Sequence, residues 1–140
     1  MRDMGTPLQR MQELCDCFAE TDPLKEMALL GRDADREEAA LKWLALAVLH
    51  GVDRHVKKIS LERGADGSVT AKAEYRETKL PSPGPEIGEK IIHAARQISH
   101  IEDKEGEMPW AVGIRDSSVE IRVKVKRKNG DEKITLTFEK

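Results

Sequence analysis

A hairpin near the end of the chain constrains the fold more than any other feature of the sequence. Apolar residues alternate with polar ones over 119–125 and again over 134–138, on either side of Asn129-Gly130. Asn-Gly is the preferred pair for a two-residue turn between antiparallel strands. This turn sets only apolar residues opposite one another: Val125 with Ile134, Val123 with Leu136 and Ile121 with Phe138. A half-buried antiparallel hairpin is therefore expected.

A second hairpin is predicted earlier in the chain. Apolar and polar residues alternate over 58–62 and 69–76, and Asp66-Gly67 lies between the two runs. A two-residue turn sets apolar residues opposite polar ones. A three-residue loop with Gly67 in the left-handed region instead pairs Leu61 with Ala71 and Ile59 with Ala73, so the register favours that loop.

Helix start signals predict three helices before the first hairpin and a fourth between the two hairpins. Thr6-Pro7 and Asp22-Pro23 each place a capping side chain before a proline, and Asp35 starts a third helix that runs to Gly51. Pro85 starts a fourth helix with a stripe of Ile87, Ile91, Ala95 and Ile98. A charged loop over 102–107 and a short strand over 111–114 follow. The expected fold is a single α+β domain, 1–140, in which N-terminal helices precede a ββαβββ unit with a mainly antiparallel sheet packed on helices.

The third helix has two apolar sides. One stripe contains Leu41, Leu44, Ala45 and Val48, and a second contains Ala39, Trp43 and Leu46. A helix of this kind is sandwiched between two partners. Two surfaces could bury Trp43 and Leu46. One is formed by the N-terminal helices of the same chain, which is favoured, and the other is the same helix of a second copy in a homodimer.

Composition excludes several classes of protein. The 140 residues are 39% hydrophobic and 36% charged, and no apolar run approaches the ~20 residues of a transmembrane helix. The N-terminus lacks the apolar stretch of a signal peptide. No membrane insertion and a cytoplasmic location are therefore expected. The net charge of -2 argues against a dedicated nucleic-acid binder.

One basic run provides a nucleic-acid alternative. Arg122, Lys124 and Lys126 alternate with apolar residues on the last hairpin, and such a ribbon could follow phosphates. No aromatic residue lies among them to stack on bases, which favours a solvated strand face.

The sequence predicts no catalytic, metal or cofactor site, and no enzyme activity. Cys15 and Cys17 are two residues apart on a helix, so their side chains diverge and cannot chelate one ion together. His93 and His100 lie opposite the isoleucine stripe of the fourth helix and are expected in solvent. The chain contains no His-Glu-x-x-His motif, nucleophile elbow or glycine-rich phosphate loop.

Residues 36–140 resemble the PAS-like N-terminal domain of type II secretion and type IV pilus assembly ATPases, with 1–34 as an N-terminal helical extension. In that family a helix ends in an Arg-Gly-Ala-Ser-Asp-Ile-His-like motif before a strand, and the last strand begins Gly-Glu-Lys. Here Leu49-His50-Gly51 precedes Ile59-Ser60-Leu61-Glu62, and Gly130-Asp131-Glu132-Lys133 begins the last strand. In the full-length enzymes of that family, arginines of this domain help to close the nucleotide site of a neighbouring motor domain. Glu107 stands where the family commonly has a basic residue, so that role cannot be carried over to it. The motor domain's phosphate loop is absent.

The resemblance implies a stand-alone protein-interaction or assembly module with a protein partner. A PAS-like sensor, with a small ligand between the sheet and the fourth helix, is one alternative. An enzyme or a nucleic-acid binder that uses the basic hairpin is the other. The candidate interaction residues are Trp43, Leu46, Trp110, Arg122, Lys124 and Lys126.

Overall fold

The structure is a computed structural model that describes residues 6–30, 35–74, 78–114 and 117–138. Within these ranges the chain first forms helices α1 (Pro7–Phe18), α2 (Pro23–Ala28) and α3 (Arg36–Asp53). Strands β1 (Lys58–Arg63), β2 (Val69–Glu74) and β3 (Thr78–Leu80) follow. Helix α4 (Gly84–Ser99) then leads to β4 (Glu105–Ile114), β5 (Ser117–Lys128) and β6 (Asp131–Phe138).

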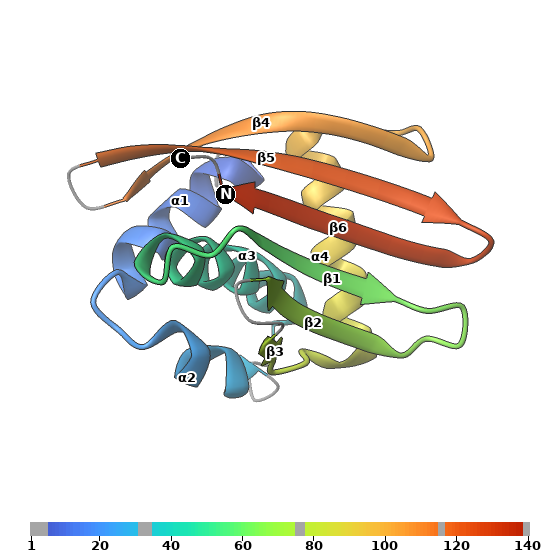
Figure 1. Ribbon diagram of the computed structural model, residues 1–140, viewed down its shortest axis with the longest axis horizontal. Coiled ribbons are helices and arrows are strands. Elements are labelled where there is room, and N and C mark those ends of the chain that lie inside the picture. Colours follow the sequence, from blue (N-terminus) through green and yellow to red (C-terminus); the bar gives the residue numbers. More distant parts are fainter. Residues whose placement is uncertain (1–5, 31–34, 75–77, 115–116, 139–140) are drawn as a thin grey trace.

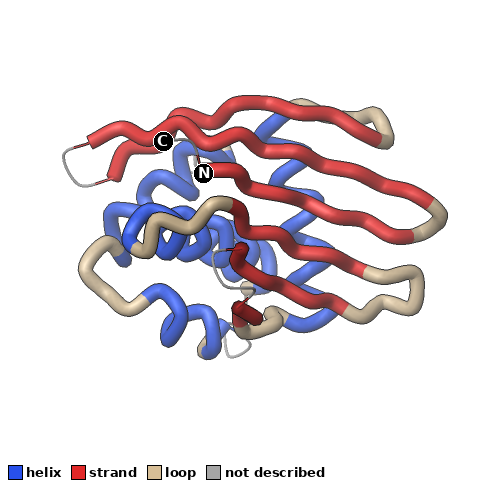
Figure 2. The backbone as a smooth tube through the Cα atoms, in the orientation of Figure 1, coloured by secondary structure: helices blue, strands red, loops and turns tan. Residues whose placement is uncertain are grey.

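The strands form one antiparallel sheet in the order β3-β2-β1-β6-β5-β4. The helices lie together on one side of this sheet, and no described helix covers its other side (Figures 1 and 2). We call the side away from the helices the outer face. The arrangement confirms the predicted α+β fold, in which N-terminal helices precede an antiparallel sheet packed on helices.

Both predicted hairpin registers are confirmed. In the β5–β6 pair Val125 lies opposite Ile134 and Val123 opposite Leu136, and the φ angles of Asn129 and Gly130 are 55° and 89°, as a two-residue primed turn requires. In the β1–β2 pair Leu61 lies opposite Ala71 and Ile59 opposite Ala73. Gly64 N–H donates to the carbonyl oxygen of Ser68 at 2.8 Å, which leaves a three-residue loop, and Gly67 has a φ of 91°.

Two strands differ from the prediction. Strand β3 is an addition to the ββαβββ order, and its three residues are too few to show a period in the sequence. Strand β4 begins at Glu105, so the second half of the segment 102–107 predicted as a charged loop is strand. Its glutamates are outer-face residues, whereas Gly106 and Met108 lie opposite the inward-facing Val125 and Val123. Charge on alternate positions is compatible with a strand that has one solvated face.

Helix α3 is buried on both of its apolar sides. Trp43, Leu44, Leu46 and Val48 are all inaccessible to solvent. Helices α1 and α2 pack against α3 on one side, and the sheet and α4 contact it elsewhere. Gly51 lies so close to β6 that an added Cβ would overlap the ring of Phe138. The helices of residues 1–34 are therefore part of the same hydrophobic core as the strands.

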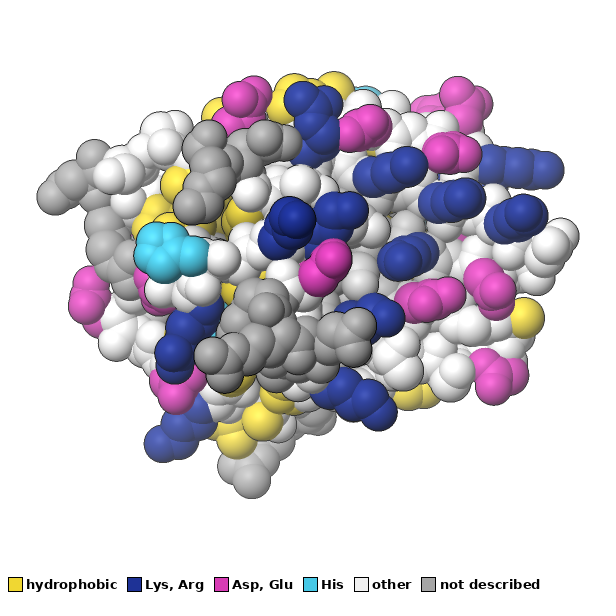
Figure 3. Space-filling model, viewed as in Figure 1, with side chains coloured by type: hydrophobic (Ala, Val, Ile, Leu, Met, Phe, Trp, Pro, Cys, Tyr) yellow, Lys and Arg dark blue, Asp and Glu magenta, His cyan; other side chains and the backbone are white. Residues whose placement is uncertain are grey.

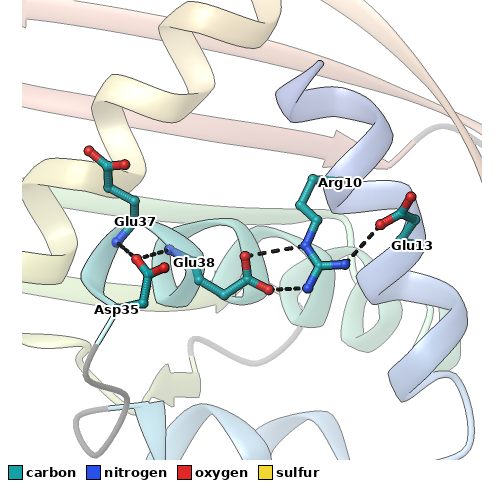
Figure 4. A network of polar contacts seen from close by, with 5 residues as sticks. All are labelled: Arg10, Glu13, Asp35, Glu37 and Glu38. Atoms are coloured by element: carbon teal, nitrogen blue, oxygen red, sulfur yellow. Dashed lines mark hydrogen bonds and ion pairs between the residues drawn. The ribbon is translucent and has the colours of Figure 1, made fainter. Parts of the chain in front are cut away.

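Polar contacts at the start of α3 attach α1 to it (Figure 4). Asp35 caps α3, because its carboxylate accepts hydrogen bonds from the backbone N–H groups of Glu37 and Glu38, both at 3.1 Å. The guanidinium of Arg10 in α1 pairs with Glu38 and, at 2.8 Å, with Glu13. Hydrogen bonds to these two carboxylates raise the pKa of Arg10 above its usual value. The ion pairs fix α1 against the first half of α3.

Helix α4 contacts the sheet closely. Ile87, Ile91 and Ala95 are buried in the core. A Cβ added at Gly88 would come within 2.6 Å of the side chain of Val69 in β2. Glycine is needed there because any side chain would push the helix away from the strand.

Arg96 attaches the loop that follows α4 to the end of the sheet. Its guanidinium donates to the carbonyl oxygen of Lys104 at 3.2 Å and lies 3.6 Å from the carboxylate of Glu132 in β6. Arg63 of β1 also approaches Glu132 at 3.6 Å. This network joins α4, β1 and β6 at one corner.

The free edge of β4 is protected against pairing with another strand. The carbonyl oxygen of Lys104 accepts from Arg127 N–H of β5, so the backbone groups of the odd-numbered residues in β4 point away from the sheet. Pro109 is one of these and has no N–H to offer. Gly113 is another, and the side chain of Gln12 both donates to its carbonyl oxygen at 2.6 Å and accepts from its N–H at 2.7 Å. These features limit edge-to-edge association.

None of the described helices is both long and apolar enough to cross a membrane.

The burial of β6 generates a prediction about stability. Leu136 is fully buried in this central strand. Leu136→Ala should lower the free energy of unfolding by about 2–5 kcal/mol, because it removes buried methyl groups and leaves a cavity. Urea denaturation measures the loss. Thr135→Ala, on the neighbouring outer-face position, is the matched control and should change stability by less than about 1 kcal/mol. Equal effects of the two substitutions would contradict the central position of Leu136.

Candidate functional site

The outer face of the sheet is the most distinctive surface of the described chain. Each strand points alternate residues toward the helices, and those residues form the core. The remaining positions face solvent, and outside β4, where Pro109, Ala111 and Gly113 are among them, they carry charged or hydroxyl side chains in the described strands. Its basic residues are Lys58, Lys72, Lys79, Arg122, Lys124, Lys126, Lys128 and Lys133. Figure 3 shows this face, where Lys and Arg side chains gather over the strands.

Acidic residues are also present on the outer face, in two groups. Glu105 and Glu107 lie on the edge strand β4, beside the basic run of β5. Lys124 approaches Glu105 at 3.7 Å and Arg122 approaches Glu107 at 3.5 Å. Glu62, Glu74, Glu120 and Asp131 lie elsewhere on the face. The glutamates of β4 therefore neutralise part of the basic run that is visible in the sequence.

Like charges lie directly opposite one another at two places on the outer face. Lys72 of β2 lies opposite Lys79 of β3, and Lys126 of β5 lies opposite Lys133 of β6. Directly opposed like charges destabilise a sheet, typically by a few tenths of a kcal/mol, at most about 1 kcal/mol. Nothing in the packing of the core requires these lysines, since their side chains are exposed.

A hollow on the outer face lies over β1, β2, β3 and β6. It has a volume of about 530 Å³, and its lining includes Lys58, Lys72, Lys79 and Lys133 together with the hydroxyl residues Ser60 and Thr135. We call it the lysine hollow. Among the described residues one carboxylate, that of Glu74, also borders it. None of its four lysines makes an ion pair within 4.0 Å with a described residue.

Three of the residues predicted to interact with partners lie inside the protein. Trp43 and Leu46 are fully buried by their own chain, so the cover by the N-terminal helices is the one observed. Trp110 is 2% exposed, and its indole N–H donates to the hydroxyl of Ser99 at 2.9 Å. These three side chains offer no surface to a partner. Arg122, Lys124 and Lys126, in contrast, are exposed on the outer face.

The cysteines and histidines do not converge on one another. Burial raises the pKa of the Cys15 thiol to about 12, and its Sγ lies 3.9 Å from the carbonyl oxygen of Ala45, whereas Cys17 is exposed. His93 borders a groove of about 520 Å³ between α3 and α4. Burial lowers the pKa of His50 in α3. In the part of the chain that the structure describes, no group of three or more potential ligands could hold a metal ion.

The lysines of the hollow did not emerge from the sequence analysis as a group. Three of them come from the consecutive strands β1, β2 and β3, and the fourth comes from β6, the last strand of the chain. Each occupies a polar position of a strand in which apolar and polar residues alternate, and this alternation was the sequence signal that could have placed them on the solvent side of the sheet. Only the strand order, in which β1 lies beside β6, brings Lys133 next to the other three.

No protein-family model matches this chain, and no curated protein matches it.

The two tryptophans generate a prediction that compares their hydrogen bonds. Trp110→Phe removes the donor to Ser99, whose hydroxyl is buried. Trp43→Phe removes an indole N–H that donates to no described acceptor. Both substitutions remove the same atoms, so Trp110→Phe should cost about 1 kcal/mol more stability than Trp43→Phe in urea denaturation. A larger loss for Trp43→Phe would contradict the role of the Ser99 hydrogen bond.

The opposed lysines generate a prediction of increased stability. Lys79 lies on an edge strand, and Lys72 is its cross-strand neighbour. Lys79→Glu replaces a repulsion by an attraction and should raise the free energy of unfolding by a few tenths of a kcal/mol, at most about 1 kcal/mol. Lys79→Gln, which removes only the repulsion, should give an intermediate value. Thermal or urea denaturation at low ionic strength measures the series, and a decrease in stability for both variants would contradict it.

Proposed function

We propose that this protein is a non-catalytic interaction module that binds an acidic segment of a partner protein across the outer face. The observation that carries the proposal is the pair of exposed lysines Lys72 and Lys79, which lie directly opposite each other and have no acidic residue directly opposite them in the described strands. An anionic partner relieves their repulsion and gains favourable charge interactions, so the arrangement suits the bound state better than the free state.

The resemblance of residues 36–140 to the N-terminal domain of secretion and pilus ATPases supports an interaction role. In that family the domain works beside a motor domain. The helices followed by an antiparallel sheet are compatible with the PAS-like resemblance.

A small-ligand sensor is less well supported. That function needs space between α4 and the sheet, and there Gly88 lies against Val69 with no room for a Cβ. The buried Ile87 and Ile91 occupy the same helix face.

A nucleic-acid binder is also less well supported. No described residue of the outer face is aromatic, so the face lacks stacking platforms for bases. Glu62 and Glu74 lie among the lysines and would repel a continuous phosphate backbone. A protein segment can place its own charges to match such a mixed pattern.

Binding to a short glutamate-rich peptide tests the proposal. Addition of the peptide to isotope-labelled protein should shift NMR amide signals of outer-face residues such as Lys72 and Lys124. Lys72→Glu combined with Lys124→Glu should weaken binding about tenfold or more, equivalent to about 1.4 kcal/mol. Because the attraction is electrostatic, binding should also weaken as salt is added.

A matched control reverses the same charge on the helical side. Lys25 in α2 and Lys90 in α4 lie away from the outer face, so Lys25→Glu combined with Lys90→Glu should leave the affinity within about twofold, since distant surface charges are screened. Signal shifts confined to the helices would contradict the proposal. Tighter binding of single-stranded DNA through Lys72 and Lys124 would replace it with the nucleic-acid alternative.

A further inference from the structure

The lysine hollow has the geometry of an anion site. Ser60 lies at its centre, with Lys72 directly opposite on β2 and Thr135 directly opposite on β6. Lys58 is two residues away along β1, and Lys133 is two residues from Thr135 along β6. With neighbouring strands about 4.8 Å apart and alternate residues about 6.7 Å apart, these positions lie within about 10 Å of Ser60. Lysine stems are long and flexible enough for the ammonium groups to converge there.

The charge in the hollow exceeds what one carboxylate can balance. Among the described residues its lining contains four lysines and one glutamate, and Glu62 lies directly opposite Lys133, so two positive charges remain when both glutamates are counted. A carboxylate brings one negative charge. A phosphoryl group brings about 1.5 to 2 negative charges near neutral pH, with three acceptor oxygens. Lysine ammonium groups and the hydroxyls of Ser60 and Thr135 are suitable donors for those oxygens.

We infer that the lysine hollow binds a phosphoryl group on the acidic partner segment, such as a phosphoserine, so that phosphorylation of the partner controls the interaction. This inference rests on the proposed function, because the phosphoryl group arrives as part of a segment bound across the outer face. The basic run of β5 contacts the flanking acidic residues and the hollow selects the modified one.

The observations favour a phosphorylated protein over a phospholipid membrane. Leu29 and Met108 are the exposed large hydrophobic residues of the described chain. Leu29 follows α2, and Met108 lies opposite the inward-facing Val123, so neither belongs to the outer face. Among the described residues, the apolar side chains of the outer face are the small Pro109 and Ala111 of β4, so the face offers no large apolar side chain to insert between lipids.

Fluorescence anisotropy with three labelled peptides tests the inference. The probe is an acidic peptide with one central residue, which is serine, phosphoserine or glutamate. The phosphoserine form should bind at least about tenfold more tightly than the other two, or about 1.4 kcal/mol. This advantage should shrink as the pH is lowered through about 6, where the phosphoryl group takes up its second proton.

Two double variants separate the hollow from the rest of the outer face. In Lys72→Gln with Lys79→Gln the advantage of phosphoserine should disappear, whereas Lys124→Gln with Lys126→Gln should weaken all three peptides and keep the ratio. Both variants remove two charges from exposed positions, so the fold should persist, which circular dichroism checks.

The outcomes distinguish the two proposals. Equal affinity for all three peptides overturns the phosphoryl site and leaves the proposed function standing. Failure of every peptide to bind overturns both. Stronger binding to vesicles that contain phosphoinositides, lost in the Lys72→Gln and Lys79→Gln variant, overturns the protein partner and assigns the hollow to a lipid headgroup.

Discussion

Cover of the sheet on one side only is the constraint on which the structure depends. Because the described helices all lie on the same side, every strand must bury alternate residues and expose the others. Val123 and Leu136 are buried partners in the central hairpin, and Ile59 lies opposite Leu136 in the next strand. The core therefore extends across β1, β5 and β6 through inward-facing residues alone. Outer-face residues are released from packing, so their chemistry can change without altering the fold.

That separation explains how the sheet tolerates opposed lysines. A like-charged pair such as Lys72 and Lys79 costs at most about 1 kcal/mol. A single buried leucine contributes several times as much, about 2–5 kcal/mol on truncation to alanine. The packing of the inner face therefore contributes enough stability to offset an unfavourable charge pattern on the outer face. The backbone under these lysines is hydrogen-bonded strand, so their Cα positions are fixed before any partner arrives.

The sequence predicted local pairings and failed where pairing is between distant segments. The registers of β1 with β2 and of β5 with β6 followed from alternation and turn chemistry, and the two-sided burial of α3 followed from its stripes. The pairing of β1 with β6 has no local signal, because no turn connects them. Strand β3 was too short to show alternation, and the charges of β4 resembled a loop because Glu105 and Glu107 point to solvent. For the candidate site, sequence alone found the cations of β5 but not the hollow, and it placed three buried residues at a surface.

The basic run of β5 and the lysines of the hollow show why the charges of a short sequence segment are a poor measure of the electrostatic potential at the protein surface. Arg122 and Lys124 belong to the most conspicuous basic run in the chain, yet the adjacent edge strand supplies a glutamate to each. Lys72 and Lys79 are separated in the sequence and attract no notice, but the sheet sets them opposite each other, with Lys58 and Lys133 close by. The attraction of a surface region for an anion depends on its net charge, which includes the charges of neighbouring side chains. Strand order determines which side chains are neighbours. The site best suited to a multiply charged anion therefore exists only in the folded sheet.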